Sequence, residues 1–430
     1  MVFMNLIIYT LRSLSYVITE PSLMIVLILL GVIFYTKNRK IVAMQKMIIG
    51  EKVNSALELT LSQIVLGIFA GVFGSIILTY LGVIFDENSG IEFLFVISIV
   101  LAFIKPRYIC FSYSGAVLGI ISIIFTYLNI TAGDGISLFS LDITMLMTFV
   151  GVIHFVEGLL VMFDGNRGSV PVFSNKAGRI MGGYALRRYW LVPIAIFIAY
   201  TSTSLGTGGT ESIATPDWWP ILRYDNIVNI IQSSILMLMP LFGMIGYSSV
   251  TFTRKKKRKA LSSGIFISVY GILLAIVAQV AKFGLVGEVI VIVFAPLAHE
   301  GMMILQRKIE DRRKPLFVSD EEGIVILEVV PYSIAYDLGL REGDKISLVN
   351  GNPINTEADI YTIAKENFNS LEFEVIDRQK NKKNIKFKYV NNTRLGIVLV
   401  PRFVDVKKVV SFESDKFSEV LENMKNKNRK

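Results

Sequence analysis

Cysteine and histidine are nearly absent from this sequence. Its 430 residues include one cysteine, Cys110, and two histidines, His154 and His299. A single cysteine excludes a disulfide framework within one chain, and because Cys110 lies in an apolar segment we expect it to serve packing. Two histidines leave few ways to build a metal centre, and the sequence predicts no metal and no cofactor.

Extended polar segments are scarce before residue 305. Hydrophobic residues make up 53% of the chain, and the mean hydropathy is +0.56. A soluble domain does not arrange its apolar content in runs of about twenty residues, which are typical of membrane-spanning helices. The pattern predicts a polytopic α-helical membrane bundle with about nine spans. These spans are residues 23–35, 61–85, 93–104, 109–130, 138–163, 190–205, 230–250, 265–281 and 285–305.

A cleavable signal peptide is not evident, because the N-terminus lacks a basic segment and a small-residue cleavage site. The first residues instead place apolar side chains along one helical stripe, and Pro21 separates this helix from the first span. We therefore expect residues 1–20 to form an amphipathic helix in the membrane interface. The stripe consists of Met4, Ile7, Ile8, Leu11 and Leu14.

Basic residues are scarce in one set of alternate loops and concentrated in the other. Positive charge resists translocation across an energised membrane, so the basic set is predicted to be cytoplasmic. The N-terminus is then outside and everything after Leu305 inside, as expected for a multi-pass membrane protein. The basic loops comprise residues 37–52, 105–107, 167–188, 254–259 and 307–314.

The net charge of +9 does not indicate nucleic-acid binding, because the basic residues lie beside the predicted spans. The run "RKKKRK" at residues 254–259 is typical of a topology signal with affinity for anionic lipid. We therefore expect contacts with anionic lipid at the basic inner loops and no nucleic-acid partner.

The sequence changes character after the last predicted span. Residues 21–305 form the predicted bundle, and residues 306–315 a basic juxtamembrane linker. Residues 316–402 alternate short strands and helices, which indicates a small α+β domain. In residues 403–430, apolar side chains follow Ser414 at helical spacing and predict a basic amphipathic tail.

The α+β segment contains a specific motif. "GIVILEVV" predicts a strand, Ser333 is an expected helix cap, and Asn350-Gly351 indicates a hairpin. The stretch "PYSIAYDLGLREGDKISLVNG" at residues 331–351 resembles a bacterial PDZ domain. This resemblance implies a module that binds an extended peptide along a sheet edge.

In PDZ domains the accepting strand follows a glycine-containing loop. In this chain the loop of that kind, "RLGI", comes last rather than first, so the resemblance implies a circularly permuted PDZ-like domain. The alternative is that residues 394–401 complete the sheet and bind no peptide. The implied peptide-binding residues are Arg394, Leu395, Gly396, Ile397 and Leu399 on the loop and strand, with Tyr361, Ala364 and Lys365 on the helix that forms the other wall.

Half of a zinc-protease signature occurs in the last predicted span. His299 is followed by Glu300, but Met303 occupies the position where His-Glu-x-x-His requires its second histidine. A neutral thioether is a poor zinc ligand. We therefore expect no metalloprotease activity and no enzymatic function.

A second pair, His154 and Glu157, lies three residues apart on one helix face, at a predicted depth similar to that of His299 and Glu300. Ionisable groups at this depth are costly unless they face the bundle interior and find partners. We predict that the two pairs meet in a polar clamp, a set of hydrogen bonds that holds the two helices together. Three alternatives stay open: Glu300 reaches Arg307 at the interface, the groups stay unpaired there, or they form a metal or proton site.

The layout of the chain resembles the MinJ family of division-site membrane proteins of Gram-positive bacteria. An amphipathic start, a proline, a first span that ends in basic residues, further spans and one C-terminal PDZ domain carry the resemblance, most clearly in the PDZ segment and less so in residues 5–40. It implies a membrane scaffold in septum placement that bridges DivIVA-like and MinC/MinD-like proteins. Separately from the resemblance, we consider a homo-oligomer. Two alternatives are a PDZ-containing regulator of a membrane protease or secretion system and a diverged site-2-type intramembrane metalloprotease.

Overall fold

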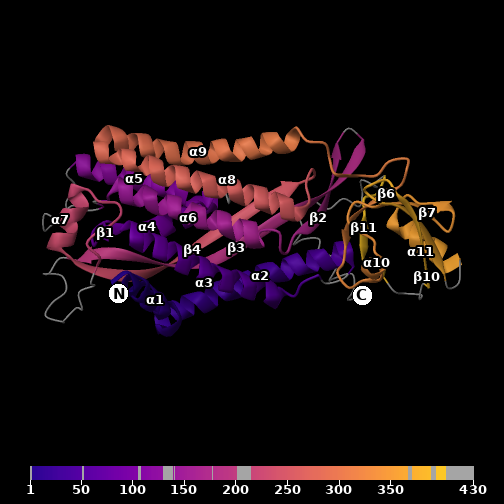
Figure 1. The fold of residues 1–430 in the computed structure, drawn as a ribbon, viewed down its shortest axis with the longest axis horizontal. Coiled ribbons are helices and arrows are strands. Elements are labelled where there is room, and N and C mark those ends of the chain that lie inside the picture. The colour runs from indigo at the N-terminus through magenta and orange to yellow at the C-terminus, as the bar shows by residue number, and fades with distance from the viewer. Residues whose placement is uncertain are drawn as a thin grey trace.

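A computed structural model describes most of the chain. The described residues are 2–50, 53–104, 108–128, 139, 141–176, 178–200, 215–366, 370–388 and 394–402. The predicted tail at 403–430 lies outside them, as do Lys52, Lys105 and Arg107 of the predicted basic loops. In Figure 1 the helices and two long strands run along the long axis of the molecule, and a small domain lies at one end.

Helices long and apolar enough to cross a membrane form most of the elongated part. Five such segments occur among the described residues. Two shorter apolar helices, α4 (Phe93–Ile104) and α5 (Phe111–Tyr127), lie between them in sequence. The five are α2 (Pro21–Ile49), α3 (Ala56–Leu81), α6 (Ile143–Asp164), α8 (Lys256–Val277) with the 3₁₀ helix η2 (Ala278–Phe283), and α9 (Leu285–Asp311).

Local sequence explains where α3 begins and ends. The hydroxyl of Ser55 accepts a hydrogen bond from the backbone N–H of Glu58 at 3.0 Å, and the Glu58 carboxylate accepts from the N–H of Ser55 at 3.5 Å. This reciprocal pair is a capping box, which satisfies two donors at the first turn. Gly82 ends the helix with a φ of 75°, a left-handed conformation that glycine adopts at little cost.

The first helix lies against the bundle. Helix α1 (Val2–Thr19) buries Leu6 and Val17, and its Thr10 hydroxyl is 3.1 Å from that of Thr79 in α3. Met4 and Leu11, on its predicted apolar stripe, stay exposed. A helix is therefore present at the predicted position, with one face against the protein and apolar side chains on its surface, and its place in the membrane interface stays a prediction.

Two of the predicted helical spans are strands. Residues 190–205 and 230–250 were expected to be helices, but they lie largely in β3 (Arg179–Tyr200) and β4 (Ile235–Thr251), an antiparallel pair with register from Tyr184↔Thr251 to Tyr200↔Ile235. The expectation of nine helical spans was wrong at these two positions. An apolar run without periodicity fits a buried strand as well as a helix, and each of these runs contains a proline that costs a helix about 3 kcal/mol.

A helix and two short strands cover the second edge of β3. Strand β2 (Val170–Lys176) pairs antiparallel with Arg179–Ala185 of β3, and β1 (Ile84–Asp86) pairs parallel with Phe197–Ala199. Helix α3 lies between them along the strand. Its Ser75 hydroxyl accepts a hydrogen bond from the N–H of Ala195 at 2.8 Å. An open strand edge is not tolerated in hydrocarbon, so this cover is what allows an extended strand among apolar helices.

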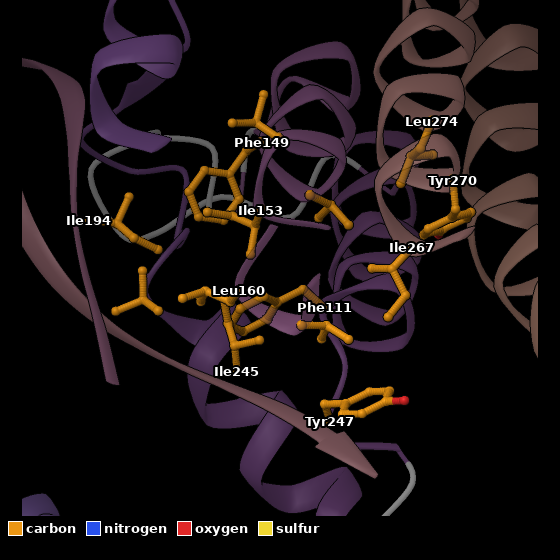
Figure 2. Packing of buried hydrophobic residues seen from close by; sticks show 14 of the residues in the cluster. Phe111, Phe149, Ile153, Leu160, Ile194, Ile245, Tyr247, Ile267, Tyr270 and Leu274 are labelled. Atoms are coloured by element: carbon orange, nitrogen blue, oxygen red, sulfur yellow. The ribbon is translucent and has the colours of Figure 1, made fainter. Parts of the chain in front are cut away.

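Small residues let α3 approach that edge. A Cβ at Gly67 would overlap the carbonyl oxygen of Leu191, and one at Gly71 would overlap the carbonyl oxygen of Pro193. Helices α6 and α8 approach each other in the same way, since a Cβ at Gly151 or at Gly271 would overlap backbone of the other helix. Close contact through small residues is the usual basis of helix packing in membranes. Figure 2 shows the side chains that fill the core around this contact, from Ile153 on α6 to Tyr270 on α8.

The C-terminal part is a small α+β domain. Its sheet has the strand order β10-β9-β7-β6-β11, with β8 paired to β7, among the described residues. Helix α10 follows β6, and α11 lies between β8 and β9 in sequence. The bounds are β5 (Phe317–Val318), β6 (Ile324–Val329), α10 (Ile334–Asp337), β7 (Lys345–Val349), β8 (Asn352–Pro353), α11 (Glu357–Glu366), β9 (Leu371–Ile376), β10 (Lys382–Phe387) and β11 (Ile397–Leu399).

This domain packs against the end of the long strand. Val398 and Leu327 belong to the same buried cluster as Tyr184 of β3, and the Tyr184 hydroxyl donates to the carbonyl of Leu327. The short strand β5 pairs with Met181 and Gly182 of β3. One apolar core therefore continues from the bundle into the domain.

The packing of α3 on β3 gives a direct test. Substitution Gly71→Leu should lower the free energy of unfolding by about 1–3 kcal/mol, because the new side chain has no space beside the Pro193 carbonyl. Gly31→Ala is the control. The new Cβ atom would make an ordinary van der Waals contact with Ile64, and alanine is more favourable than glycine in a helix. Thermal unfolding in detergent measures both variants. Equal unfolding temperatures would contradict the close packing.

Candidate functional site

The predicted polar clamp residues lie close together between α6 and α9. The imidazole rings of His154 and His299 are 5.8 Å apart, and Cys110, the residue before α5, lies between their Nε2 atoms. His154 lies between Gly151 and Gly158, and a Cβ at either glycine would overlap backbone of α8. The glycine contacts described above therefore fix the position of this histidine in the bundle.

His154 is buried and has partners at both ring nitrogens. Its Nδ1 lies 2.8 Å from the carbonyl oxygen of Val150, one turn earlier in α6. Its Nε2 lies 3.1 Å from Cys110 Sγ, 3.2 Å from the Ser112 hydroxyl and 3.9 Å from Glu157 Oε2. A carbonyl can only accept, so Nδ1 carries the proton and the Nε2 lone pair faces the cysteine when the ring is neutral.

His299 has a similar arrangement on the other side of Cys110. Its Nε2 is 3.6 Å from Cys110 Sγ, and its Nδ1 is 3.3 Å from the hydroxyl of Tyr113. That hydroxyl donates to Glu300. The partner of Glu300 is therefore Tyr113. Met303 occupies the position at which a zinc protease has its second histidine, and its side chain is 38% exposed on α9.

A cavity of about 490 Å³ adjoins this group. Cys110, Glu157 and His299 line it, together with charged residues near the ends of α8 and α9, including Lys259 and Arg307. The remaining lining is mostly apolar, from residues of β4 such as Ile245. The cavity gives the buried polar group a route toward the end of the bundle that carries the C-terminal domain.

Sequence reasoning found the histidines and carboxylates but missed three neighbours. Cys110 was assigned to packing, and Ser112 and Tyr113 were not considered, although all three contact a histidine. Their position near the start of an apolar run, next to a basic loop, places them at the depth of the two histidine pairs. The same depth argument could therefore have included them. That the group acts as a structural clamp stays a prediction.

The predicted peptide-binding residues fall on two neighbouring elements of the C-terminal domain. Leu395, Ile397 and Leu399 are buried in one apolar cluster with Ala364 of α11, and Tyr361 packs against that cluster. Gly396 has a φ of 73° and lies against Ser333. Arg394 and Lys365 are exposed. Among the described residues, β11 pairs with β6 alone and forms one edge of the sheet.

Comparison with known proteins yields one informative match. No family model matches the chain. It is 23% identical over 238 residues to the cell division topological determinant MinJ of Bacillus subtilis (strain 168). The similarity is distant. It covers 53% of this chain and 54% of MinJ, so the chain spans about half the length of the curated relative that it matches.

A charge contact joins the C-terminal domain to α8. Lys256 lies 2.8 and 2.7 Å from the two carboxylate oxygens of Glu328 on β6, whose side chain is 7% exposed. Burial raises the pKa of Glu328, and Lys256 partly offsets this rise. The ion pair therefore keeps a carboxylate charged inside the contact between domain and bundle.

Substitution Lys256→Met should weaken this contact in a pH-dependent way. Without the ammonium group the pKa of Glu328 rises further, and breaking a buried ion pair costs about 3–5 kcal/mol. A carboxyl group with a raised folded-state pKa destabilises above that pKa and recovers as the pH falls through it. The variant should therefore unfold at a lower temperature than wild type at about pH 8, and the difference should shrink at about pH 5.

The neighbouring Lys257 is exposed and provides the control. Lys257→Met should leave the unfolding temperature near that of wild type at both pH values, because no buried carboxylate loses its partner. A deficit of Lys256→Met that is the same at both pH values would contradict the role assigned to Glu328.

Proposed function

We propose that this chain is a membrane scaffold of bacterial division-site placement, which recruits cytoplasmic partners through a circularly permuted PDZ-like domain. Its apolar helices and its distant similarity to MinJ, a cell division topological determinant, support this proposal. The observation that carries it is the edge strand β11, which follows a glycine in the left-handed region and lies beside α11. PDZ domains recognise peptides by strand addition at such an edge.

The peptide would extend the sheet beyond β11. Main-chain groups of Leu395, Gly396 and Ile397 would receive it, while Tyr361 and Lys365 of α11 would line its other side. Leu399 and Ala364 would support the groove from the core, where both are buried. The exposed guanidinium of Arg394 and ammonium of Lys365 would favour a peptide with acidic character or a free carboxylate.

The distribution of charge supports a cytoplasmic location for this domain. Basic residues lie in the C-terminal half of α2, at the start of α8 and at the end of α9, where the domain is attached (Figure 1). Positive residues favour the cytoplasmic side and attract anionic lipid. The N-terminus would then be outside. We propose no enzymatic activity and no nucleic-acid partner.

The partners follow from the resemblance to the MinJ family. DivIVA-like and MinC/MinD-like proteins would bind at the cytoplasmic face, and homo-oligomers would present several domains together. Linked domains bind a clustered partner more tightly than one domain does, because the later contacts are intramolecular.

The double variant Lys365→Glu/Arg394→Ala tests peptide recognition. It should abolish division-site enrichment of a fluorescent full-length fusion in a Gram-positive rod, and it should reduce recovery of cytoplasmic partners after crosslinking in native membranes. Lys382→Glu is the control, because β10 lies at the opposite edge of the sheet from β11. Both proteins should show the same unfolding temperature. Unchanged septal enrichment of the folded double variant would refute the proposed site.

A further inference from the structure

Three ligand atoms from separate parts of the bundle converge on one point. Cys110 Sγ and one nitrogen each of His154 and His299 lie within 4.8 Å of one another. We propose that these residues bind a zinc ion, with Glu157 as the fourth ligand, and that the ion joins α6, α9 and the start of α5. This inference is independent of the proposed scaffold function.

The distances between ligand atoms suit a tetrahedral ion. Zinc–sulfur bonds of about 2.3 Å and zinc–nitrogen bonds of about 2.0–2.1 Å place sulfur and nitrogen about 3.6 Å apart around such an ion. The corresponding separations here are 3.1 Å to His154 Nε2 and 3.6 Å to His299 Nε2. Glu157 Oε2 is 3.9 Å from His154 Nε2. Glu157 lies outside the group of ligand atoms that are within 4.8 Å of one another, so its side chain would have to move toward Cys110 and His299 to complete the shell.

The second ring nitrogens are held as they are in known metal sites. A metal-binding histidine usually donates its other N–H to a carbonyl or a similar group, which fixes the ring and its tautomer. His154 Nδ1 faces the Val150 carbonyl at 2.8 Å, and His299 Nδ1 faces the Tyr113 hydroxyl at 3.3 Å. Glu300 in turn accepts from Tyr113. Both Nε2 lone pairs are therefore directed at the same sulfur.

The donor set selects the metal. A thiolate with two imidazoles suits zinc or copper rather than magnesium or calcium, which prefer oxygen ligands. A copper site of the type His₂Cys takes a long, weak axial ligand such as methionine. Here the fourth group is the carboxylate of Glu157, a common zinc ligand. The set therefore favours zinc.

Charge balance also supports an ion at this depth. On binding, the Cys110 thiol releases its proton to solvent, so a thiolate and the Glu157 carboxylate together carry the charge that compensates Zn²⁺. The resulting centre is neutral, which lowers the cost of burying charge among apolar helices. The cavity lined by Cys110, Glu157 and His299 gives the ion an entry route.

The alternative is a hydrogen-bonded clamp without metal. In that arrangement Tyr270 donates to the carbonyl of Ala295, Ser112 donates to Tyr270, and the Cys110 thiol donates to His154. Ser112 is a suitable control for the zinc site, because its hydroxyl lies 3.2 Å from His154 Nε2 but is not a proposed zinc ligand.

Metal analysis of the full-length protein in detergent tests the assignment. The protein is purified without a polyhistidine tag, treated with a chelator and then supplied with Zn²⁺ or Co²⁺. We expect about one zinc ion per chain. Since Cys110 is the sole cysteine, a near-ultraviolet thiolate-to-cobalt band would arise from this residue. Zinc should also raise the unfolding temperature, because it binds the folded state.

Two variants complete the test. Cys110→Ala should lose at least about ten-fold in bound zinc, together with the cobalt band and the zinc-dependent rise in unfolding temperature. Ser112→Ala should keep all three. If Cys110→Ala does not fold, the thiolate-to-cobalt band of the wild-type protein shows whether Cys110 binds the metal. Less than about a tenth of an ion per wild-type chain, or a cobalt spectrum without the thiolate band, would overturn the proposal.

Discussion

The architecture depends on satisfying the backbone of one extended strand. Strand β3 lies among apolar helices, where an unpaired N–H or carbonyl costs several kcal/mol. Strand β4 covers one edge, while β2, α3 and β1 share the other. Ser75 supplies a hydroxyl to this edge, and glycines allow α3 to lie against its carbonyls. Helix α3 is thereby held along the strand, and α6, which carries His154, packs against α3.

The same strand joins the two parts of the molecule. At its N-terminal end β3 pairs with β2 and β5, and its Tyr184 contacts β6. A buried ion pair between Asp164 of α6 and Arg188 of β3 lies a few residues further along, and Trp190 donates to the same carboxylate at 2.9 Å. Both side chains are buried, so removing either one would leave the charge of the other without a partner in the core. Polar contacts therefore help to specify the packing in this region, together with apolar contacts.

The sequence was informative about helices and local motifs and less so about long-range pairing. Four predicted spans correspond to α3, α6, α8 and α9. Their length and apolar composition are typical of membrane-spanning helices, so the sequence alone predicts their structure. Residues 190–205 and 230–250 were misassigned because pairing with a distant segment, rather than local propensity, decides their structure. The depth of His154 and His299 predicted their proximity. Cys110 was missed because its place between them depends on how three helices pack.

The linker between α9 and β5 is short. Helix α9 ends at Asp311 and β5 begins at Phe317. An attachment of this length holds the domain at an effective concentration on the order of millimolar at its contact surface on the bundle. Even a weak contact therefore keeps the domain docked most of the time. A partner that needed the buried face of β6 and β11 would have to compete with that tethered surface.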